Sequence, residues 1–519
     1  MKKISILFGW FLLLLSGCVN LDEEIYDKHR AEGFIKSPED ALAVLAPAYG
    51  SLRARGVVFD FMWEAVELTS GTMVTPTRGQ HWYEGGRFQR AHLQKFDYQD
   101  GISSGPWGSC FSGISTCNRI LFQLKNQEFE DKDMFLGEVR MIRAYYLFQL
   151  MSLYGNIPYV DRFDVEEGFL PEQYTQDEVY DILIKELNEV IPLLSKEVDG
   201  STYSRWTYWA GLALRARVYL NAHMFKSKST DPASWGTNEF DKCMADCDKI
   251  INSGKFSIEP DFKANFKADN HVSKEIIYAI PFDNIHGSGW YIANKTLHYQ
   301  NQHTFGLSTK PWNGMCAIPE FYNSFDDEDY RKTDCWLVGQ QYSRDGKPLV
   351  CTEESKGQPL VFVPDGFTYK EAKEYHGARV NKWEFYEDQT MWSKNDFPVF
   401  RLADAYMMKA ECLWRKGNVG EAADIINTQI RARNFKTPKP VSAAELTEER
   451  LLDEMRWEFF GELRVRLDMR RFGKLTKGKW LNKPAYDHYD FDWLPIPKAA
   501  LDSNSKLKQN PGAFYSGMN

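Results

Sequence analysis

The chain has 519 residues, a formal net charge of −9 at pH 7 and 15% aromatic residues, including 16 Trp and 26 Tyr. A chain of this length has room for roughly two to four domains. The negative charge argues against a nucleic-acid partner, because such binding depends on neutralising phosphates. The nine Cys are too few and too scattered for a disulfide scaffold.

The first residues have the order of a secretory signal. Two lysines precede an apolar stretch at 4–15, and Ser16 and Gly17 then lead to Cys18. This stretch of about a dozen residues is shorter than the roughly 20 that a helix needs to span a bilayer, so we expect residues 1–17 to be cleaved. Residues 15–18, L-S-G-C, resemble a bacterial lipobox, which predicts a lipidated Cys18. The alternative is an ordinary signal peptide that ends near a Cys.

Apolar residues recur at helical spacing through the first half of the chain. The clearest helix is expected at 134–154, because Gly155 and Pro158 follow it as a C-terminal Gly and a later Pro should. The full set of helices expected here is 38–52, 107–124, 134–154, 177–194, 205–225 and 240–251.

The pattern changes near residue 255. Gly, Pro, Asn and aromatic residues become frequent, and short strand-like runs such as 275–280 occur. Helices are expected again at 402–416, 420–433 and 444–472. The stretch at 403–422 resembles a tetratricopeptide helix pair. We therefore predict a mainly α fold in which tetratricopeptide-like helix pairs form a scaffold, with a large irregular insertion of loops and short strands in the middle.

These patterns divide the chain into regions. We expect a signal peptide at 1–17 and a lipidated N-terminus and linker at 18–37. An N-terminal helical region at 38–254 precedes a C-terminal region at 255–519, which consists of a ligand-loop insertion at 255–399 and helical pairs with a tail at 400–519.

Several segments, in order along the chain, resemble one family, the SusD/RagB-like nutrient-uptake lipoproteins of Bacteroidetes. They are E-V-R-M-I-R-A-Y-Y-L-F at 138–148 with L-Y-G-N-I-P at 153–158, F-R-L-A-D-A-Y at 400–406 with K-A-E at 409–411, the helix at 455–473, and L-P-I-P at 494–497 with Q-N-P-G at 509–512. A fifth segment, V-T-P-T-R-G at 74–79 with W-Y at 82–83, resembles a loop in one large branch of the family.

Two positions depart from the family pattern. Ser70-Gly71-Thr72 stands where that branch usually carries Thr-Asp-Glu, so a carboxylate near the loop is missing. Leu463 replaces the Gly that normally follows the Glu at position 462. The first departure bears on the ligand more than on the fold.

The resemblance implies a function without catalysis. Such a protein captures an oligosaccharide and delivers it to a SusC-like TonB-dependent transporter, over whose mouth it sits as a lid. The acidic residues at 22–24 resemble the surface-export signal of these lipoproteins, although a solvated linker is an equal alternative. We expect a lipid-anchored protein of the cell outer membrane that faces outward, with no cofactor.

Arginines are concentrated on helices rich in Glu and Asp. Glu462 and Arg466 are spaced i,i+4 and could pair on one helix face. We interpret this charge pattern as structural, with the arginines clamping helices together. The arginines concerned are Arg140, Arg143, Arg456, Arg466 and Arg471.

Motifs for catalysis or metal binding are absent: the chain has no P-loop, H-E-x-x-H, G-x-S-x-G or paired C-x-x-C. Cys243 and Cys247 are i,i+4, but two ligands do not make a metal site, so we expect buried or unpaired thiols. We interpret His298 and His303 as polar loop residues. The acidic run at 326–329 lacks the spacing of a Ca²⁺ loop and predicts a solvated turn.

Aromatic residues in loops are the remaining candidates for a binding site. A sugar can stack its apolar face on a Trp or Tyr ring while polar groups at the edge bind its hydroxyls. The predicted ligand-binding residues are Arg78, Trp82, Tyr83, Trp290, Tyr291 and Trp312. For each ring, ordinary core packing is the alternative. We expect weak binding, with a Kd of roughly 10 µM to 1 mM.

Two other functions remain open. A surface glycoside hydrolase would need two carboxylates about 5–9 Å apart across a cleft, and among 72 acidic residues some pair always meets that condition. A transporter-lid subunit with no sugar site of its own would need no aromatic cleft.

Overall fold

The computed structural model describes residues 35, 37–287 and 289–518. The predicted signal peptide, the lipidation site Cys18 and the acidic run at 22–24 lie outside these residues. Among the described helices, none is long and apolar enough to cross a membrane.

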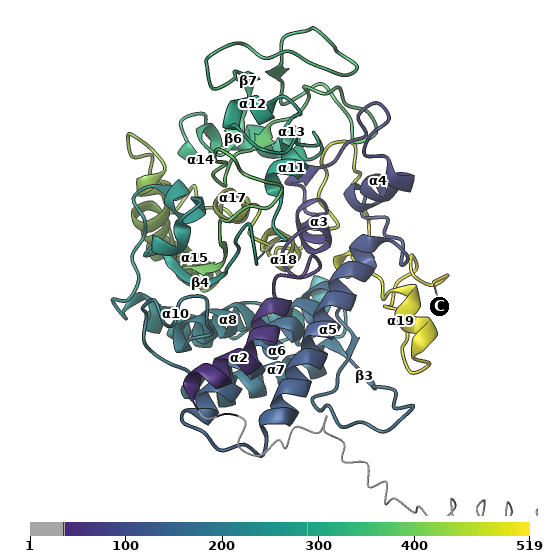
Figure 1. The fold of residues 1–519 in the computed structure, drawn as a ribbon, viewed down its shortest axis with the longest axis vertical. Coiled ribbons are helices and arrows are strands. Elements are labelled where there is room, and N and C mark those ends of the chain that lie inside the picture. Colours follow the sequence, from purple (N-terminus) through teal and green to yellow (C-terminus); the bar gives the residue numbers. More distant parts are fainter. Residues whose placement is uncertain (1–34, 36, 288, 519) are drawn as a thin grey trace, which may run out of the picture.

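Long helices build most of the N-terminal part of the fold and lie in the lower half of Figure 1, whereas the short α3 and α4 lie above them. Packed neighbours include α5 with α6, α6 with α7, and α8 with α10. The helix α6 ends where Gly155 adopts a φ of 69°, a left-handed value that favours Gly. The helices are α2 Pro38–Ser51, α3 Phe61–Glu67, α4 Arg87–His92, α5 Gly101–Leu124, α6 Lys132–Tyr154, α7 Gln176–Val190, α8 Tyr208–Leu220, α9 Ala222–Phe225 and α10 Phe240–Ile251.

The C-terminal helices stack on this scaffold. The helix α15 packs against both α8 and α10, and α16 returns along α15 as the second member of a hairpin. After α16 the chain continues through a π-helical turn at Ile426–Ile430 and a 3-10 turn at Arg431–Arg433. The helices are α15 Leu402–Arg415, α16 Val419–Ile425, α17 Glu448–Phe459, α18 Val465–Arg471 and α19 Lys498–Ser503.

The middle of the chain forms short helices and strands in the upper half of Figure 1. Its helices are α11 Ile292–Thr296, α12 Asn301–Phe305, α13 Pro319–Ser324 and α14 Tyr330–Thr333. All sheets within the described residues are two-stranded and antiparallel. They pair β1 Met73–Val74 with β5 Cys316–Ala317, β4 Ile276–Ile280 with β10 Phe397–Arg401, β2 Ile157–Pro158 with β3 Gln173–Tyr174, β6 Trp336–Leu337 with β9 Arg379–Val380, and β7 Gly339–Gln340 with β8 Val361–Phe362.

Two of these pairings join segments that are far apart in the sequence. The strands β4 and β10 bring the two ends of the irregular middle segment together, and α15 follows β10 directly in the sequence. The pairing of β1 with β5 places the loop after residue 74 beside the middle segment. The predicted mainly α scaffold with an irregular insertion is therefore confirmed.

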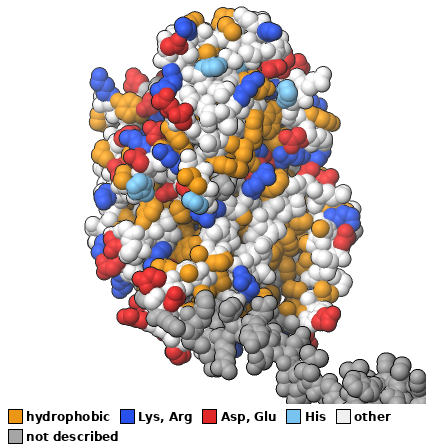
Figure 2. All heavy atoms as spheres, viewed as in Figure 1, with side chains coloured by type: hydrophobic (Ala, Val, Ile, Leu, Met, Phe, Trp, Pro, Cys, Tyr) orange, Lys and Arg blue, Asp and Glu red, His pale blue; other side chains and the backbone are white. Residues whose placement is uncertain are grey.

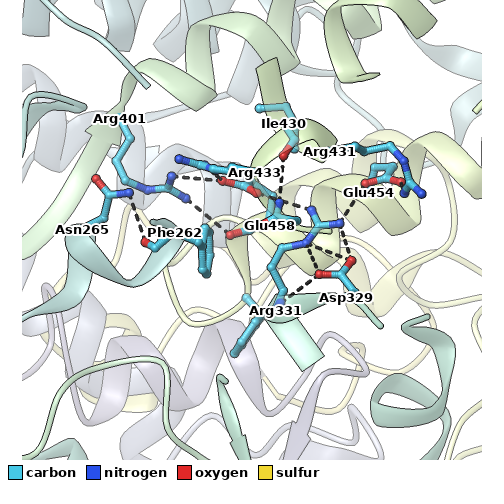
Figure 3. Close-up of polar contacts among 12 residues, drawn as sticks. Phe262, Asn265, Asp329, Arg331, Arg401, Ile430, Arg431, Arg433, Glu454 and Glu458 are labelled. Atoms are coloured by element: carbon cyan, nitrogen blue, oxygen red, sulfur yellow. Dashed lines mark hydrogen bonds and ion pairs between the residues drawn. The ribbon is translucent and has the colours of Figure 1, made fainter. Parts of the chain in front are cut away.

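A buried network of ion pairs connects the middle segment to α17. Arg401 contacts Glu458 at 3.1 Å and Glu275 at 2.6 Å, and Arg433 contacts Glu458 at 2.6 Å. Arg331 bonds to Asp329 at 2.6 Å and reaches Glu454 and Glu458 (Figure 3). The α17 carboxylates Glu454 and Glu458 thus bind segments that are distant in the sequence.

Three of the five arginine clamps expected from the sequence join helices, and the other two bond to the turn after α3. Arg140 and Arg143 of α6 both bond to Glu186 of α7, each at 2.7 Å. Arg471 of α18 bonds to Glu411 of α15 at 2.6 Å. Arg456 donates to the Gly71 carbonyl at 2.8 Å, and Arg466 donates to Thr69 Oγ1 at 2.7 Å.

Two predictions about the helix at 444–472 are wrong. The chain leaves the helix after α17, where Gly461 and Leu463 have φ values of 77° and 58°, and it re-enters at α18. Glu462 lies in this break and therefore does not pair with Arg466. It contacts Arg401 and Lys382 instead, at 2.8 and 2.6 Å.

The cysteines of the described part are thiols. All eight are free and buried, including Cys243 and Cys247 on α10. This confirms the expectation of buried thiols. No group of three or more potential metal-ligating residues was found among the described residues.

Candidate functional site

A cleft of about 930 Å³ opens where the early loop meets the middle segment. The pairing of β1 with β5 creates this junction. In the space-filling view a stripe of hydrophobic side chains lies over the region of α11 and α4, with charged side chains beside it (Figure 2). The cleft is lined by Arg55, Asp60, Phe61, His81, Trp82, Glu84, Arg87, Gly101, Tyr291, Lys295, Tyr299, Lys310, Pro311, Trp312 and Glu353.

Three aromatic side chains form a continuous wall of the cleft. The rings of Tyr291 and Trp312 lie 5.7 Å apart between centroids, at an angle of 59°. The indole Nε1 of Trp82 donates a hydrogen bond to the Trp312 carbonyl at 3.0 Å. Trp312 is 37% exposed and Trp82 is half-buried, whereas Tyr291 is largely covered. The two indoles therefore offer most of the accessible ring surface.

The backbone around the wall adopts conformations that side chains rarely take. Asp60, Trp82, Glu84 and Asn313 have φ values of 52°, 66°, 40° and 55°. Such conformations cost on the order of 1–3 kcal/mol each and are concentrated at functional sites. A Cβ on Gly314 would lie 2.6 Å from the Trp82 ring, so a glycine at this position lets the indole pack closely.

Buried ion pairs support the wall from behind. Lys295 Nζ lies 2.8 Å from Asp60 Oδ1 and 2.7 Å from Glu64 Oε1, and Arg87 Nη1 lies 2.5 Å from Glu64 Oε2. The same ammonium lies 5.6 Å from the Trp82 ring centroid and 5.7 Å from that of Tyr291. A cation at this distance attracts the ring faces.

The pair of Lys295 and Asp60 keeps its charges. Burial alone would lower the pKa of Lys295, but Glu64 and Asp60 raise it above its usual value. Burial would raise the pKa of Asp60, but Lys295 and Arg55 lower it below its usual value. Because its pKa is lowered by these cations, Asp60 is not placed to act as a proton donor.

The rim of the cleft carries exposed polar groups of both signs. His81, Glu84, Lys310 and Glu353 are exposed, and the Lys310 ammonium lies 4.8 Å from the Tyr299 ring centroid. Arg55 donates to the Tyr291 hydroxyl at 3.1 Å. The arrangement suits a ligand with an apolar face and hydroxyl groups at its edges.

The structure brings three of the predicted ligand-binding residues together at this cleft, namely Trp82, Tyr291 and Trp312. Tyr83 is 54% exposed next to Trp82 but does not line the cleft. The remaining two predicted residues, Arg78 and Trp290, are structural.

Trp290 is a core residue, which corrects the prediction. Its side chain is 0% exposed and packs edge-on against Phe59 at 4.5 Å and Trp383 at 5.1 Å between centroids. Because protein atoms surround the ring, neither face is available to a ligand. Its sequence neighbour Tyr291 points to the cleft instead.

Arg78 also has a structural position. It is 1% exposed and donates hydrogen bonds to the carbonyls of Gly314, Lys373 and His376, at 3.3, 2.5 and 3.0 Å. Burial lowers the pKa of its guanidinium. These carbonyls belong to the middle segment, so the hydrogen bonds of Arg78 fix the early loop to that segment.

Two further sequence interpretations need correction. His298 is buried and bonds to Glu374 at 3.0 Å, and burial lowers its pKa to about 4. His303 is exposed, but it lies in α12 and not in a loop. Asp329, at the end of the acidic run, is buried against Arg331. The first three acidic residues of that run pair with lysines near the surface.

The residues that sequence reasoning missed are mainly charged. Arg55, Asp60 and Lys295 gave no signal, because the two segments that carry them are distant in the sequence and only the fold joins them. Lys310 stands beside the Pro that precedes Trp312, so its proximity to a predicted ring was a usable signal.

A helical scaffold that presents an aromatic cleft with a charged rim defines the molecule as a ligand-binding protein. Two family models match the chain: "SusD family" over residues 364–512, and "Starch-binding associating with outer membrane" over residues 65–220. The chain belongs to the SusD family.

Curated relatives support this assignment at low identity. "Starch-binding protein SusD" of Bacteroides thetaiotaomicron is 26% identical over 427 residues, which cover 72% of each chain. "SusD-like protein P2" of Formosa agariphila is 23% identical over 99% of this chain and 100% of its own length.

Solved structures show the same fold. Surface glycan-binding protein A from Bacteroides thetaiotaomicron, in complex with laminarihexaose, has a TM-score of 0.70 at 18% identity and covers 91% of this chain and 99% of its own. A laminarin-binding SusD-like protein has a TM-score of 0.71 at 20% identity, with coverage of 92% and 100%. These proteins are named for binding, in agreement with the expected function without catalysis.

Proposed function

We propose that the protein is a surface glycan-binding lipoprotein that captures oligosaccharides in the cleft at Trp82, Tyr291 and Trp312. The observation that carries the proposal is the wall of accessible indole rings beside polar groups of both signs. A pyranose stacks its C–H face on such rings and releases water, while Arg, Lys, His and carboxylate groups bind its hydroxyls. The relatives named for starch and laminarin binding support a carbohydrate ligand.

The proposal extends to the place of the protein in the cell. A lipidated Cys18 would anchor it in the outer membrane, facing outward, and a SusC-like TonB-dependent transporter would receive the ligand. The lipobox-like L-S-G-C at 15–18 supports the anchor, and the name of the model matched at 65–220 supports the outer membrane. No covalent step on the ligand is involved.

The direct test is isothermal titration calorimetry of the purified protein with soluble oligosaccharides. The panel includes malto- and laminari-oligosaccharides, because relatives are named for starch and laminarin. We expect at least one glycan to bind with a Kd of roughly 10 µM to 1 mM. Trp312→Ala removes the most exposed ring of the wall and should weaken that binding about 5- to 10-fold.

The control is Tyr342→Ala, which removes an exposed ring that does not line the cleft. Its affinity should equal that of the unmodified protein. If Trp312→Ala and Trp82→Ala both bind every glycan of the panel as the unmodified protein does, the cleft is not the site.

The two other functions make different predictions in the same experiment. A surface glycoside hydrolase would release products, which chromatography of the titrated samples would detect. A transporter-lid subunit without a sugar site would bind no member of the panel yet co-purify with the transporter.

A further inference from the structure

A second, smaller cavity lies inside the protein, where the N-terminal helices meet β10 and α18. Its volume is about 30 Å³, enough for one small ion or one water molecule. Side chains of α6, α8, β10, α18 and the loop before α18 line it. Four of the lining residues are arginines that are at most 7% exposed: Arg217, Arg464, Arg466 and Arg470.

The buried charge network around α17 is balanced. Its main contacts are those of Figure 3, together with the pairs of Lys382 and Arg401 to Glu462. Five cations meet five carboxylates in it, so each buried charge has a counter-charge. The cations are Arg331, Lys382, Arg401, Arg431 and Arg433, and the carboxylates are Glu275, Asp329, Glu454, Glu458 and Glu462.

The arginines around the small cavity are not balanced in this way. Arg217 and Arg464 share one carboxylate, Asp404. Arg464 also shares Asp468 with Arg471. A cation whose counter-charge is shared keeps part of its charge uncompensated.

Two of the arginines have no ion-pair partner. Arg466 donates to Thr69 Oγ1 at 2.7 Å and to the Phe491 carbonyl at 2.9 Å, and Arg470 donates to Gln176 Oε1 at 2.8 Å. Asp492 is the carboxylate that acts on both from a distance, and burial raises its pKa to about 6. Counted together, Arg217, Arg464, Arg466, Arg470 and Arg471 face four carboxylates, Asp404, Glu411, Asp468 and Asp492. The cavity lining also contains Glu462, but that carboxylate pairs with Lys382 and Arg401.

Hydrogen-bond donors at the cavity also lack protein partners. Buried nitrogens of all four lining arginines make no hydrogen bond within the protein: Nε of Arg217, Arg466 and Arg470, and Nη2 of Arg464. The Ser152 hydroxyl on the same lining is likewise unpartnered. An unsatisfied buried polar group costs roughly 1–3 kcal/mol, and more when it is charged.

We propose that this cavity is a binding site for one small monovalent anion of about the size of chloride. Such an anion would accept hydrogen bonds from the arginine nitrogens and would offset the positive excess. A water molecule would satisfy the donors but would leave the charge. Burial lowers the pKa of Arg466 and Arg470 to about 10, and an adjacent anion would relieve that cost.

The position of the site predicts what the anion does. Ser152 and Arg217 come from the N-terminal helices, whereas Arg466 and Arg470 come from the C-terminal α18. An anion bound by all of them joins the two parts of the fold. Because a ligand that binds only the folded state stabilises it, thermal stability should depend on the anion concentration.

The first test is thermal unfolding at fixed ionic strength, with sodium chloride replacing sodium gluconate, whose anion is too large for the cavity. We expect the unfolding midpoint to rise by about 1 °C for each tenfold increase in chloride above the Kd. Arg470→Met should remove most of this dependence. Arg344→Met, which changes an exposed arginine paired with Glu387, should retain it.

The second test locates the ion in crystals of the unmodified protein soaked in bromide. An anomalous peak in the cavity, within hydrogen-bonding distance of Arg466 and Arg470, would support the site even if Arg470→Met fails to fold. The proposal is overturned if the cavity contains only non-anomalous density and the midpoint is the same in chloride and gluconate, because water then fills the site.

Discussion

Trp82 and Trp290 carry the same ring and both follow Gly-containing segments, yet only Trp82 faces the cleft. The difference arises from the surroundings of each residue. Trp82 has a φ of 66° and packs its ring over Gly314, whereas Trp290 is enclosed by Phe59 and Trp383. The orientation of a loop aromatic is thus set by which distant residues close around it.

Gly314→Ala tests how the Trp82 ring is positioned. The added Cβ would lie 2.6 Å from the indole, so the ring must move, and we expect glycan binding to weaken about 5-fold. Calorimetry would measure the affinity for the glycan, and tryptophan fluorescence would report the movement of the ring. Gly420→Ala, at a glycine with open space around it, should leave both unchanged. Equal affinities for the two variants would contradict the role of Gly314.

Glu67→Gln tests a buried acid behind the early loop. Burial raises the pKa of Glu67 to about 7, and Thr72 Oγ1 donates to its Oε2 at 3.0 Å. The folded protein therefore holds a proton that the unfolded chain loses near pH 4.5, and stability falls as the pH rises from about 4.5 to about 7. Gln does not titrate, so the variant should gain on the order of 2–3 kcal/mol over the unmodified protein at pH 8.

Urea unfolding at a series of pH values measures this difference. The stabilities of the two proteins should converge below about pH 4.5, where Glu67 is protonated in both states. A difference that is the same at pH 5 and pH 8 would show that Glu67 does not titrate in this range.

At the scale of elements, the helix predicted at 444–472 shows how a local pattern can mislead. The apolar spacing of 444–472 fits one helix, and the structure has two, α17 and α18. Buried Glu462 turns toward Arg401 and Lys382, and these ion pairs require the break. Leu463 occupies a left-handed conformation that normally favours Gly, the residue type that the family pattern carries there.

Glu458→Gln tests the network that holds α17. Glu458 is buried and contacts Arg331, Arg401 and Arg433, so neutralising it leaves buried cations without compensation. We expect a loss of about 3–5 kcal/mol in the free energy of unfolding. Glu189→Gln removes a half-exposed partner of Arg140 and should cost less than about 1 kcal/mol. Denaturant unfolding compares the two, and similar losses would rule out a special role for the network.

At the scale of the whole molecule, the proposed anchor precedes the described fold and can be tested separately from it. Cys18→Ser should move the protein from the membrane fraction to the soluble fraction, because acyl chains contribute about 0.8 kcal/mol per buried CH₂. Fractionation of cells measures where the protein is, and metabolic labelling with palmitate measures whether it is acylated.

A variant in which the acids at 22–24 are replaced by the corresponding amides keeps Cys18 and should remain membrane-bound. The sensitivity of this variant to external protease reports whether the acidic run directs export to the cell surface. For the other variant, palmitate label on the Cys18→Ser protein would contradict lipidation at Cys18.

The sequence alone was sufficient for the helical scaffold, the irregular middle and the family, because these depend on local periodicity and on motifs in a fixed order. It also singled out five loop rings, three of which line the cleft. Only the tertiary structure decided which rings are accessible. It also decided that Arg78 donates its hydrogen bonds to main-chain carbonyls, and that Lys295 forms ion pairs with Asp60 and Glu64. These features depend on the pairing of β1 with β5, and no local pattern encodes a contact between segments so far apart in the chain.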